Sequence, residues 1–287
     1  MQYKIKSNSF QLKDVFECGQ CFRWNQETDG SYTGVFDNCV LNVEMHGTEI
    51  TFSGTYDGKK QKVFEEKIIK YFDLNEDYEN IKKTLAKVDV NLKNSIEYGS
   101  GIRILNQDLW ETIISFIISA NNNIPRIKGI IERICKTYGN KIEWNGKKHY
   151  TFPTPKQLSK ARVEELRKLG LGFRDVRVYE TTKLINSGEF YLKELYKLST
   201  EQAREKLLIL PGVGPKVADC ILLFSDLKRF DVFPIDVWVR RVMNELYIHN
   251  NEEKKVNKKQ IQQLANDKFG NLQGIAQQYL FYWKREA

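Results

Sequence analysis

The stretch that most constrains the fold is Leu208–Cys220, which reads LILPGVGPKVADC. Segments on both sides of Pro-Gly-Val-Gly carry apolar side chains at helical spacing. Because only a short glycine-rich turn separates them, the sequence predicts a helix hairpin over residues 201–223. Gly212 and Gly214 can take positive φ angles, which lets the backbone approach a ligand closely.

The second helix of this hairpin begins with unpaired backbone N–H groups, and such a helix end favours an anion such as phosphate. A plain helix connection is the alternative. The composition favours the phosphate interpretation, because 45 Lys and Arg against 37 Asp and Glu give a formal charge of +8. The turn and the charge together indicate that the hairpin contacts DNA phosphates.

Lys216 stands in the first turn of the second helix, directly behind the glycine-rich turn. The positive end of the helix dipole disfavours an ammonium there. If bound DNA also removes water from the site, we expect the amine to lose its proton more readily and to act as a nucleophile. A lysine that only pairs with phosphate is the alternative unless a catalytic partner is present.

A partner follows in the stretch Asp231–Arg241, which reads DVFPIDVWVRR. Asp236 comes just after Pro234 at a predicted helix start, where the helix dipole keeps a carboxylate ionised. A simple N-cap is the alternative, since Asp is common at that position. A lysine and an ionised aspartate at two helix starts indicate attack on an electrophilic carbon beside a developing positive charge.

The periodicity predicts an α+β fold: an N-terminal antiparallel β-sheet domain with covering helices, residues 1–95, and a helical region, residues 96–287, that shares its core. Residues 30–56 have the alternation of a β meander with a turn at His46-Gly47. After about Val90 strand signals almost vanish, and Asp108 is a suitable N-cap. Helices are predicted over residues 61–72, 77–88, 108–118, 124–138, 156–168, 174–187, 200–208, 216–223, 235–245, 258–269 and 272–283, and the first two could cover one face of the sheet.

Composition and cysteine usage exclude several classes of protein. No stretch approaches the roughly 18 apolar residues of a membrane span, and the first residues lack the apolar core of a signal peptide. The five cysteines are odd in number and scattered, which suits a reducing compartment, so we expect a soluble cytoplasmic protein. Cys18 and Cys21 have the spacing of a zinc half-site, but no second pair completes it, and we expect neither a metal nor a cofactor.

Several motifs together resemble one family. LPGVGPKVADC followed by FPIDVWVRR is similar to the helix-hairpin-helix, Gly/Pro-rich, Asp signature of the DNA glycosylase superfamily. The match is specifically to the 8-oxoguanine DNA glycosylase/AP lyases in a compact bacterial-like form, and it covers most of the chain. The other motifs are GQCFRW at 19–24, SANNNIPRIKGIIERIC at 119–135, RKLGLGFR at 167–174 and GIAQQYLF at 274–281.

The resemblance implies a bifunctional enzyme. Lys216 would attack C1′ of a flipped deoxynucleotide, expel the damaged base and form a Schiff base that permits β-elimination of the 3′ phosphate. Asp236 would stabilise the oxocarbenium character of the sugar. Flipping is needed because a side chain cannot reach C1′ in a stacked duplex. The implied partner is duplex DNA that contains 8-oxoguanine, bound by a monomer that needs no membrane.

The same resemblance implies a lesion pocket. The carbonyl of Gly19 would accept the N7 hydrogen that 8-oxoguanine has and guanine lacks. Gln277 would read the Watson–Crick edge, Phe281 would stack on the flipped base, and Cys220 would lie on the opposite face. Read without the family, Phe281 and Cys220 are core residues and Gln277 is an ordinary helix residue.

A second set of residues resembles the family's contacts to the opposite strand. Asn121, Arg126 and Arg174 would fill the vacated space and contact the orphaned cytosine, whose pairing edge offers acceptors to arginine. A phosphate contact is the alternative for each arginine. Two positions depart from the animal members: Phe173 stands where they place a Tyr wedge, and Trp238 replaces a His two residues after the aspartate.

Two other functions stay open at this point. One is a related bifunctional glycosylase for another damaged base, because Lys216 indicates lyase chemistry without naming the base. The other is a non-catalytic helix-hairpin-helix DNA-binding protein, which borohydride would not trap on DNA.

Overall fold

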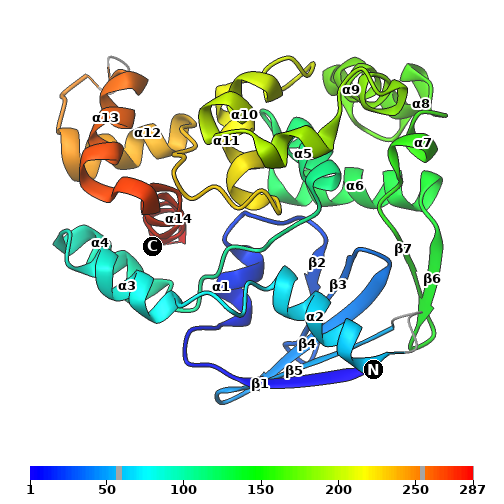
Figure 1. Cartoon of the computed structure of the whole chain (residues 1–287), viewed down its shortest axis with the longest axis horizontal. Helices are drawn as coiled ribbons and strands as arrows, with labels where there is room; N and C mark the ends of the chain where they lie inside the picture. The colour runs from blue at the N-terminus through cyan, green and yellow to red at the C-terminus, as the bar shows by residue number, and fades with distance from the viewer. Residues whose placement is uncertain (56–59, 253–255, 287) are drawn as a thin grey trace.

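The computed structural model describes residues 1–55, 60–252 and 256–286 (Figure 1). Its N-terminal part is a five-stranded antiparallel sheet in the order β1-β5-β4-β3-β2. The strands are β1 (Gln2–Lys6), β2 (Trp24–Gln26), β3 (Tyr32–Phe36), β4 (Cys39–His46) and β5 (Glu49–Gly54).

The predicted meander is confirmed by β3, β4 and β5, with Gly47 in the left-handed region at a φ of +62°. Its predicted end at Tyr56 lies outside the described residues. The edge strand β1 lies outside the prediction, because a single five-residue alternation is a weak signal. It forms because Tyr3 and Ile5 pair with residues of β5.

Two helices, α1 (Leu12–Glu17) and α2 (Gln61–Tyr71), pack on the sheet and build the first hydrophobic core. Phe16 stacks on Trp24 with ring centroids 4.3 Å apart. Phe64 of α2 is fully buried in the same core. The predicted covering helix over 61–72 is therefore confirmed.

The predicted single shared core is two clusters, and the second is built by the helices of the rest of the chain together with Cys18 and Phe22 of the N-terminal part. The central helix α5 (Leu109–Ser119) is buried along most of its length, and the predicted N-cap is confirmed because Asp108 accepts a hydrogen bond from Glu111 N at 2.8 Å. The other helices are α3 (Tyr78–Ala86), α4 (Val90–Tyr98), α6 (Ile124–Tyr138), α7 (Pro155–Leu158), α8 (Val163–Lys168), α9 (Asp175–Ser187), α10 (Thr200–Leu207), α11 (Pro215–Phe224), α12 (Val237–Met243), α13 (Lys258–Phe269) and α14 (Gln273–Glu286).

Two predictions about helices are wrong in detail. The helix over 77–88 exists as α3, but it does not cover the sheet, because its apolar residues Ile81 and Leu85 belong to the second core. The single helix over 156–168 is two helices, α7 and α8, and Ala161 is buried between them.

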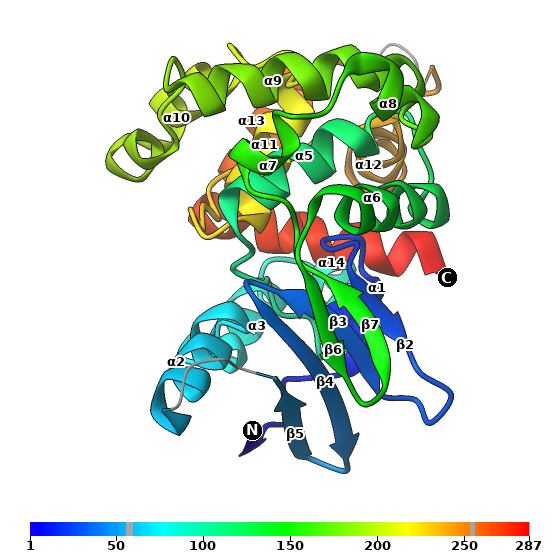
Figure 2. The same ribbon diagram turned by 90° about the vertical axis from the view of Figure 1, so that its right-hand side faces the viewer.

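The region after Val90 is not purely helical, which corrects the prediction. A hairpin of β6 (Lys141–Trp144) and β7 (Lys147–Tyr150) turns at Asn145-Gly146, where both φ angles are positive. That turn chemistry is typical of a tight β-hairpin, so the Asn-Gly pair is the signal that could have found it. The hairpin lies beside the N-terminal sheet (Figure 2), where Lys147 pairs with Glu27 at 2.9 Å.

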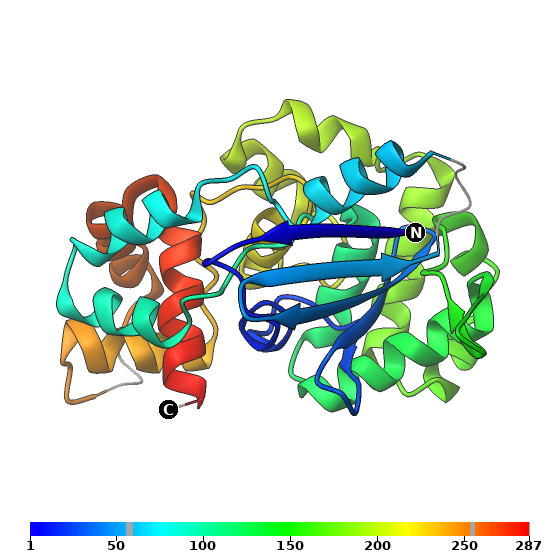
Figure 3. The same ribbon diagram turned by 90° about the horizontal axis from the view of Figure 1, so that it is seen from below.

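Segments far apart in the sequence lie side by side. The helices α3 and α4 lie with α12, α13 and α14 on one side of the molecule, and the sheet lies between them and the α6–α8 side (Figure 3). Helix α14 packs directly on α4. The division at residues 95 and 96 stays a prediction. Within the described ranges, every helix is too short or too polar to cross a membrane.

Candidate active site

The predicted hairpin is confirmed by α10 and α11, which pack on each other. Gly212 has a φ of +89°, and a Cβ there would lie 3.0 Å from Ile117 Cγ2, so the turn needs glycine. Gly214 does not use the positive φ that glycine allows; its φ is −95°, because it is the extended N-cap of α11. No side chain caps this helix start, which leaves its N–H groups available to a ligand.

Lys216 is half-buried in the first turn of α11. Its Nζ lies 5.5 Å from the centroid of the Phe116 ring and hydrogen-bonds the sulfur of Cys220 one turn along the helix. Burial lowers the pKa of Lys216, but the Cys220 sulfur and the Asp236 carboxylate outweigh burial and raise that pKa above its usual value. In the DNA-free protein the net shift in the pKa of Lys216 is therefore opposite to the predicted lowering.

Asp236 is the N-cap of α12, and its carboxylate accepts a hydrogen bond from Val239 N at 2.8 Å. Its electrostatic effect on Lys216 means that the two helix starts lie near each other. The next two side chains, Val237 and Trp238, are 57% and 37% exposed. Both side chains therefore lie at the surface, directly after Asp236.

Gly19 belongs to a loop in which the neighbouring backbone carbonyls all accept hydrogen bonds. Arg285 donates to the carbonyl of Glu17, Gln278 donates to that of Cys18 at 2.5 Å, and Gln107 donates to that of Gln20 at 2.8 Å. Among the described residues, no hydrogen bond reaches the carbonyl of Gly19. The loop therefore presents one free acceptor between fixed neighbours.

The other residues predicted for the lesion pocket come from α14 and α11. A Cβ on Gly19 would lie 3.5 Å from the ring of Phe281, which is half-buried. Gln277 is 5% exposed, and its buried Oε1 has no hydrogen-bond partner within the described ranges. Cys220 is 2% exposed on α11. The two helices meet where Gly274 contacts Leu223, which brings these side chains onto adjoining elements.

The residues predicted to face the opposite strand form a cationic cluster around an exposed ring. Phe173 is 55% exposed, and its ring lies 4.2 Å from the guanidinium of Arg174 and 5.3 Å from that of Arg177. Arg126 is also exposed, with one long contact of 3.4 Å to the carbonyl of Gly170. An exposed phenylalanine between arginines is suited to a polyanion with flat bases.

Arg174 differs from Arg126, because it is almost fully buried. Its three nitrogens donate to the carbonyls of Ala120, Leu171 and Asn121 at 2.6–3.1 Å. Asn121 is exposed and has a positive φ of 51°, a strained conformation that these contacts hold. Arg174 therefore positions Asn121, while Arg126 is the arginine with free donors.

Sequence reasoning missed Gln278, Arg177 and Arg285. Arg177 and Arg285 contact the predicted residues Phe173 and Phe281, and Gln278 holds the carbonyl of Cys18 next to Gly19. Gln278 stands beside Gln277 in GIAQQYLF, and periodicity does not tell which amide reads a ligand and which holds the loop. The signal for Arg177 and Arg285 is their spacing of about one helical turn from Phe173 and Phe281.

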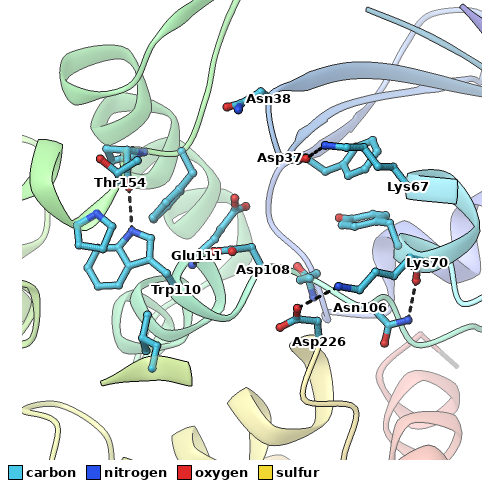
Figure 4. A pocket seen from close by; sticks show the side chains of 17 residues that line it. Asp37, Asn38, Lys67, Lys70, Asn106, Asp108, Trp110, Glu111, Thr154 and Asp226 are labelled. Carbon is cyan, nitrogen blue, oxygen red and sulfur yellow. Dashed lines mark hydrogen bonds and ion pairs between the residues drawn. The ribbon is translucent and has the colours of Figure 1, made fainter. Parts of the chain in front are cut away.

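A separate hollow of about 560 Å³ lies between α2, the start of α5 and residues 152–155, and none of the predicted site residues lines it (Figure 4). Lys67 pairs with Asp37, and Lys70 pairs with Asp226 at 3.4 Å. Glu111 also lines it, and its carboxylate lies 3.6 Å from Arg23. Burial raises the pKa of Glu111 to about 7, against the lowering by Arg23.

Glu111 makes stability depend on pH in a predictable direction. The pKa of Glu111 is higher in the folded protein than the usual 4.5. Its contribution to the free energy of unfolding is therefore fully present below pH 4.5 and is lost as pH rises through about 7. We expect the free energy of unfolding of the wild type, relative to Glu111→Gln, to fall by on the order of 2 kcal/mol from pH 5 to pH 8. Urea unfolding of both proteins at several pH values measures this, and parallel pH curves would contradict it.

Two family models cover the chain. Residues 2–113 match the 8-oxoguanine DNA glycosylase N-terminal domain, and residues 114–278 match the HhH-GPD superfamily of base excision DNA repair proteins. The chain belongs to the HhH-GPD superfamily. The predicted resemblance is thereby confirmed.

Relatives of this superfamily member align over most of its length. The N-glycosylase/DNA lyase of Saccharomyces cerevisiae is 33% identical over 277 residues, covering 86% of this chain and 72% of that protein. A structure of MBOgg1 with a low-affinity DNA ligand has a TM-score of 0.93 at 45% identity, covering 99% of this chain and 96% of that one. The Clostridium acetobutylicum 8-oxoguanine glycosylase/lyase, in complex with double-stranded DNA containing cytosine opposite 8-oxoG, has a TM-score of 0.92 at 40% identity and covers 100% and 98%. These matches confirm the predicted enzyme class, a bifunctional DNA N-glycosylase/AP lyase.

Proposed function

We propose that this superfamily member excises 8-oxoguanine from duplex DNA through a Lys216 Schiff base and then cleaves the strand by β-elimination. The assignment of the substrate rests on the free carbonyl of Gly19, because the carbonyls of its neighbours all accept hydrogen bonds. A fixed acceptor discriminates for the N7 hydrogen of 8-oxoguanine and against the N7 lone pair of guanine. Single-turnover excision from duplexes carrying 8-oxoguanine, guanine and other lesions tests the substrate.

The proposed reaction uses Lys216 at the start of α11 and Asp236 at the start of α12. The nitrogen of Lys216 bonds to C1′ as the glycosidic bond breaks, and the departing base takes the electron pair and a proton. Opening of the sugar gives the Schiff base, and loss of a C2′ proton then expels the 3′ phosphate. Lys216 must lose its proton first; burial under bound DNA favours that loss, whereas Asp236 and Cys220 oppose it.

Asp236 stabilises positive charge at the sugar, because its cap geometry fixes the carboxylate near Lys216. In the lesion pocket Phe281 stacks on the flipped base, Cys220 lies on the opposite face, and Gln277 reads the pairing edge with its unpartnered Oε1. Such a buried unpaired acceptor is costly until a ligand donor reaches it.

The duplex binds across the hairpin and the arginine cluster. Gly212 shapes the turn, Gly214 leaves the start of α11 open to a phosphate, and the Phe173 ring inserts between bases. Arg126 and Asn121 face the orphaned cytosine, and Arg174 holds Asn121 in place. We further propose that the protein acts as a cytoplasmic monomer.

Binding to DNA is expected to weaken steeply with salt, because phosphate contacts release counterions. With about four phosphates neutralised, the slope of log affinity against log salt is about −3.6, a loss of about a hundredfold between 50 and 200 mM. Fluorescence anisotropy with a labelled duplex measures the slope. A flat dependence would contradict phosphate contacts by the hairpin and the arginines.

Arg126→Met is expected to lower the preference for cytosine over adenine opposite the lesion by roughly tenfold or more. Cytosine offers acceptors to the free donors of Arg126, whereas adenine presents a donor amine and leaves a buried group unpaired. Single-turnover excision opposite cytosine and adenine gives the ratio.

The control is Lys136→Met, which removes an exposed charge from the last turn of the same helix, α6. It should leave the ratio unchanged. Equal ratios in the wild type and Arg126→Met would leave Arg126 as a phosphate contact.

A further inference from the structure

Arg285 lies one turn beyond Phe281 on α14 and reaches the Gly19 loop with its guanidinium. Nε donates to Glu286 at 2.9 Å, and Nη2 donates to the carbonyl of Glu17. Nη1 is buried and has no hydrogen-bond partner among the described residues. A buried cationic donor without a partner is costly, so Nη1 is a group that a ligand acceptor would satisfy.

Nη1 of Arg285 lies near two residues of the proposed lesion pocket, Gly19 and Phe281. Nη1 lies 3.0 Å from the position of a Cβ on Gly19, and the guanidinium carbon lies 5.3 Å from the centroid of the Phe281 ring. Nη1 therefore lies close to the α-carbon of Gly19, whose carbonyl is free. The guanidinium also lies near the ring of Phe281, which would stack on the base.

The chemistry of the lesion supplies the matching acceptor. Compared with guanine, 8-oxoguanine carries a hydrogen on N7 and a carbonyl oxygen on the adjacent C8. An acceptor and a donor side by side would read both changes at once. Guanine offers only a C8 hydrogen opposite the donor and repels the Gly19 carbonyl with its N7 lone pair.

We propose that Arg285 is a specificity-determining residue whose Nη1 donates to the C8 carbonyl of the flipped 8-oxoguanine, next to the contact between Gly19 and N7–H. The proposal rests on the proposed function. It also assigns Nη2 a positioning role, because its contact with Glu17 fixes the loop that carries Gly19.

The experiment distinguishes recognition of the C8 carbonyl by Arg285 from a purely structural role of Arg285 in holding the Gly19 loop. Affinities are measured in the uncleaving Lys216→Gln background for duplexes with 8-oxoguanine, guanine, and 8-thioguanine, which keeps N7–H but has a poorer acceptor at C8. Arg285→Met is expected to lose about ten- to a hundredfold affinity for 8-oxoguanine, about twofold or less for guanine, and much less for 8-thioguanine than for 8-oxoguanine.

A purely structural Arg285 would weaken binding of 8-oxoguanine and 8-thioguanine by the same factor, and that outcome overturns the proposal. Unchanged binding of 8-oxoguanine also overturns it. Cleavage of a preformed abasic site by Arg285→Met with Lys216 intact is expected to match the wild type, because no base is read there. Loss of that cleavage would make Arg285 a structural residue.

The control variant is Lys268→Met on the neighbouring helix α13, which removes one cation and its 3.4 Å ion pair with Asp89 at the start of α4. It should keep the preference for 8-oxoguanine. If the wild-type enzyme fails to excise 8-oxoguanine at all, the proposed function fails. If the wild type excises it and Arg285→Met binds it equally well, only the role of Arg285 fails.

Discussion

Lys216→Gln is expected to abolish covalent trapping and to slow base excision by at least about a thousandfold, while DNA affinity changes only a few-fold. The amide is neutral and cannot form a bond to C1′, so no surrounding group can restore the lost step. Affinity is expected to survive, because the phosphate contacts proposed for the hairpin backbone and the exposed arginines do not use Lys216. Borohydride trapping and single-turnover excision on one 8-oxoguanine duplex measure both effects.

Lys216→Arg is the matched control, because it keeps the positive charge beside Cys220 and Asp236 but replaces the proposed nucleophile. Guanidinium stays protonated at any working pH, so this variant should be as inactive as Lys216→Gln. Full trapping by either variant would remove Lys216 as the attacking residue. If the arginine variant were active and the glutamine variant were not, position 216 would contribute its positive charge and not a nucleophilic nitrogen.

Asp236→Asn is expected to lower the single-turnover rate by on the order of a hundred- to a thousandfold, with little change in affinity. The carboxylate matters most when the sugar becomes cationic, and removing one preorganised electrostatic group has effects of this size. Asparagine caps helices about as well as aspartate, so the hydrogen bond to Val239 N and the start of α12 are kept. The experiment therefore isolates the charge from the cap.

Asp236→Ala provides the complementary measurement, because it removes the cap as well. We expect it to lose about 1 kcal/mol of stability relative to Asp236→Asn. If Asp236→Asn excises 8-oxoguanine at the wild-type rate, the carboxylate is a helix cap and has no part in the reaction.

The sequence predicted the large elements for physical reasons that the structure makes clear. The helix hairpin, the caps Asp108 and Asp236, and the meander follow from local turn and capping chemistry that acts within a few residues. The hairpin of β6 and β7 was within reach, since Asn145-Gly146 is a strong turn signal. The short edge strand β1 was not, because it depends on pairing with β5.

The site was harder to predict because its contacts are long-range. The buried position of Arg174 and its hold on Asn121 depend on where α9 meets the end of α5. The net rise in the pKa of Lys216 depends on how close Cys220 and Asp236 come, which no local pattern contains. Even the negative φ of Gly214 follows from its place as an N-cap and not from its residue type.

The contact between Gln278 and Cys18 joins residues 260 positions apart. Closing so large a loop is entropically costly and must await the folding of the elements between its ends. On the ribosome, the Gly19 loop can reach its final form only after α14 has emerged, well after the sheet and the α10–α11 hairpin have been synthesised. The Gly19 loop, which is proposed to recognise the damaged base, is therefore among the last parts of the site to form during synthesis.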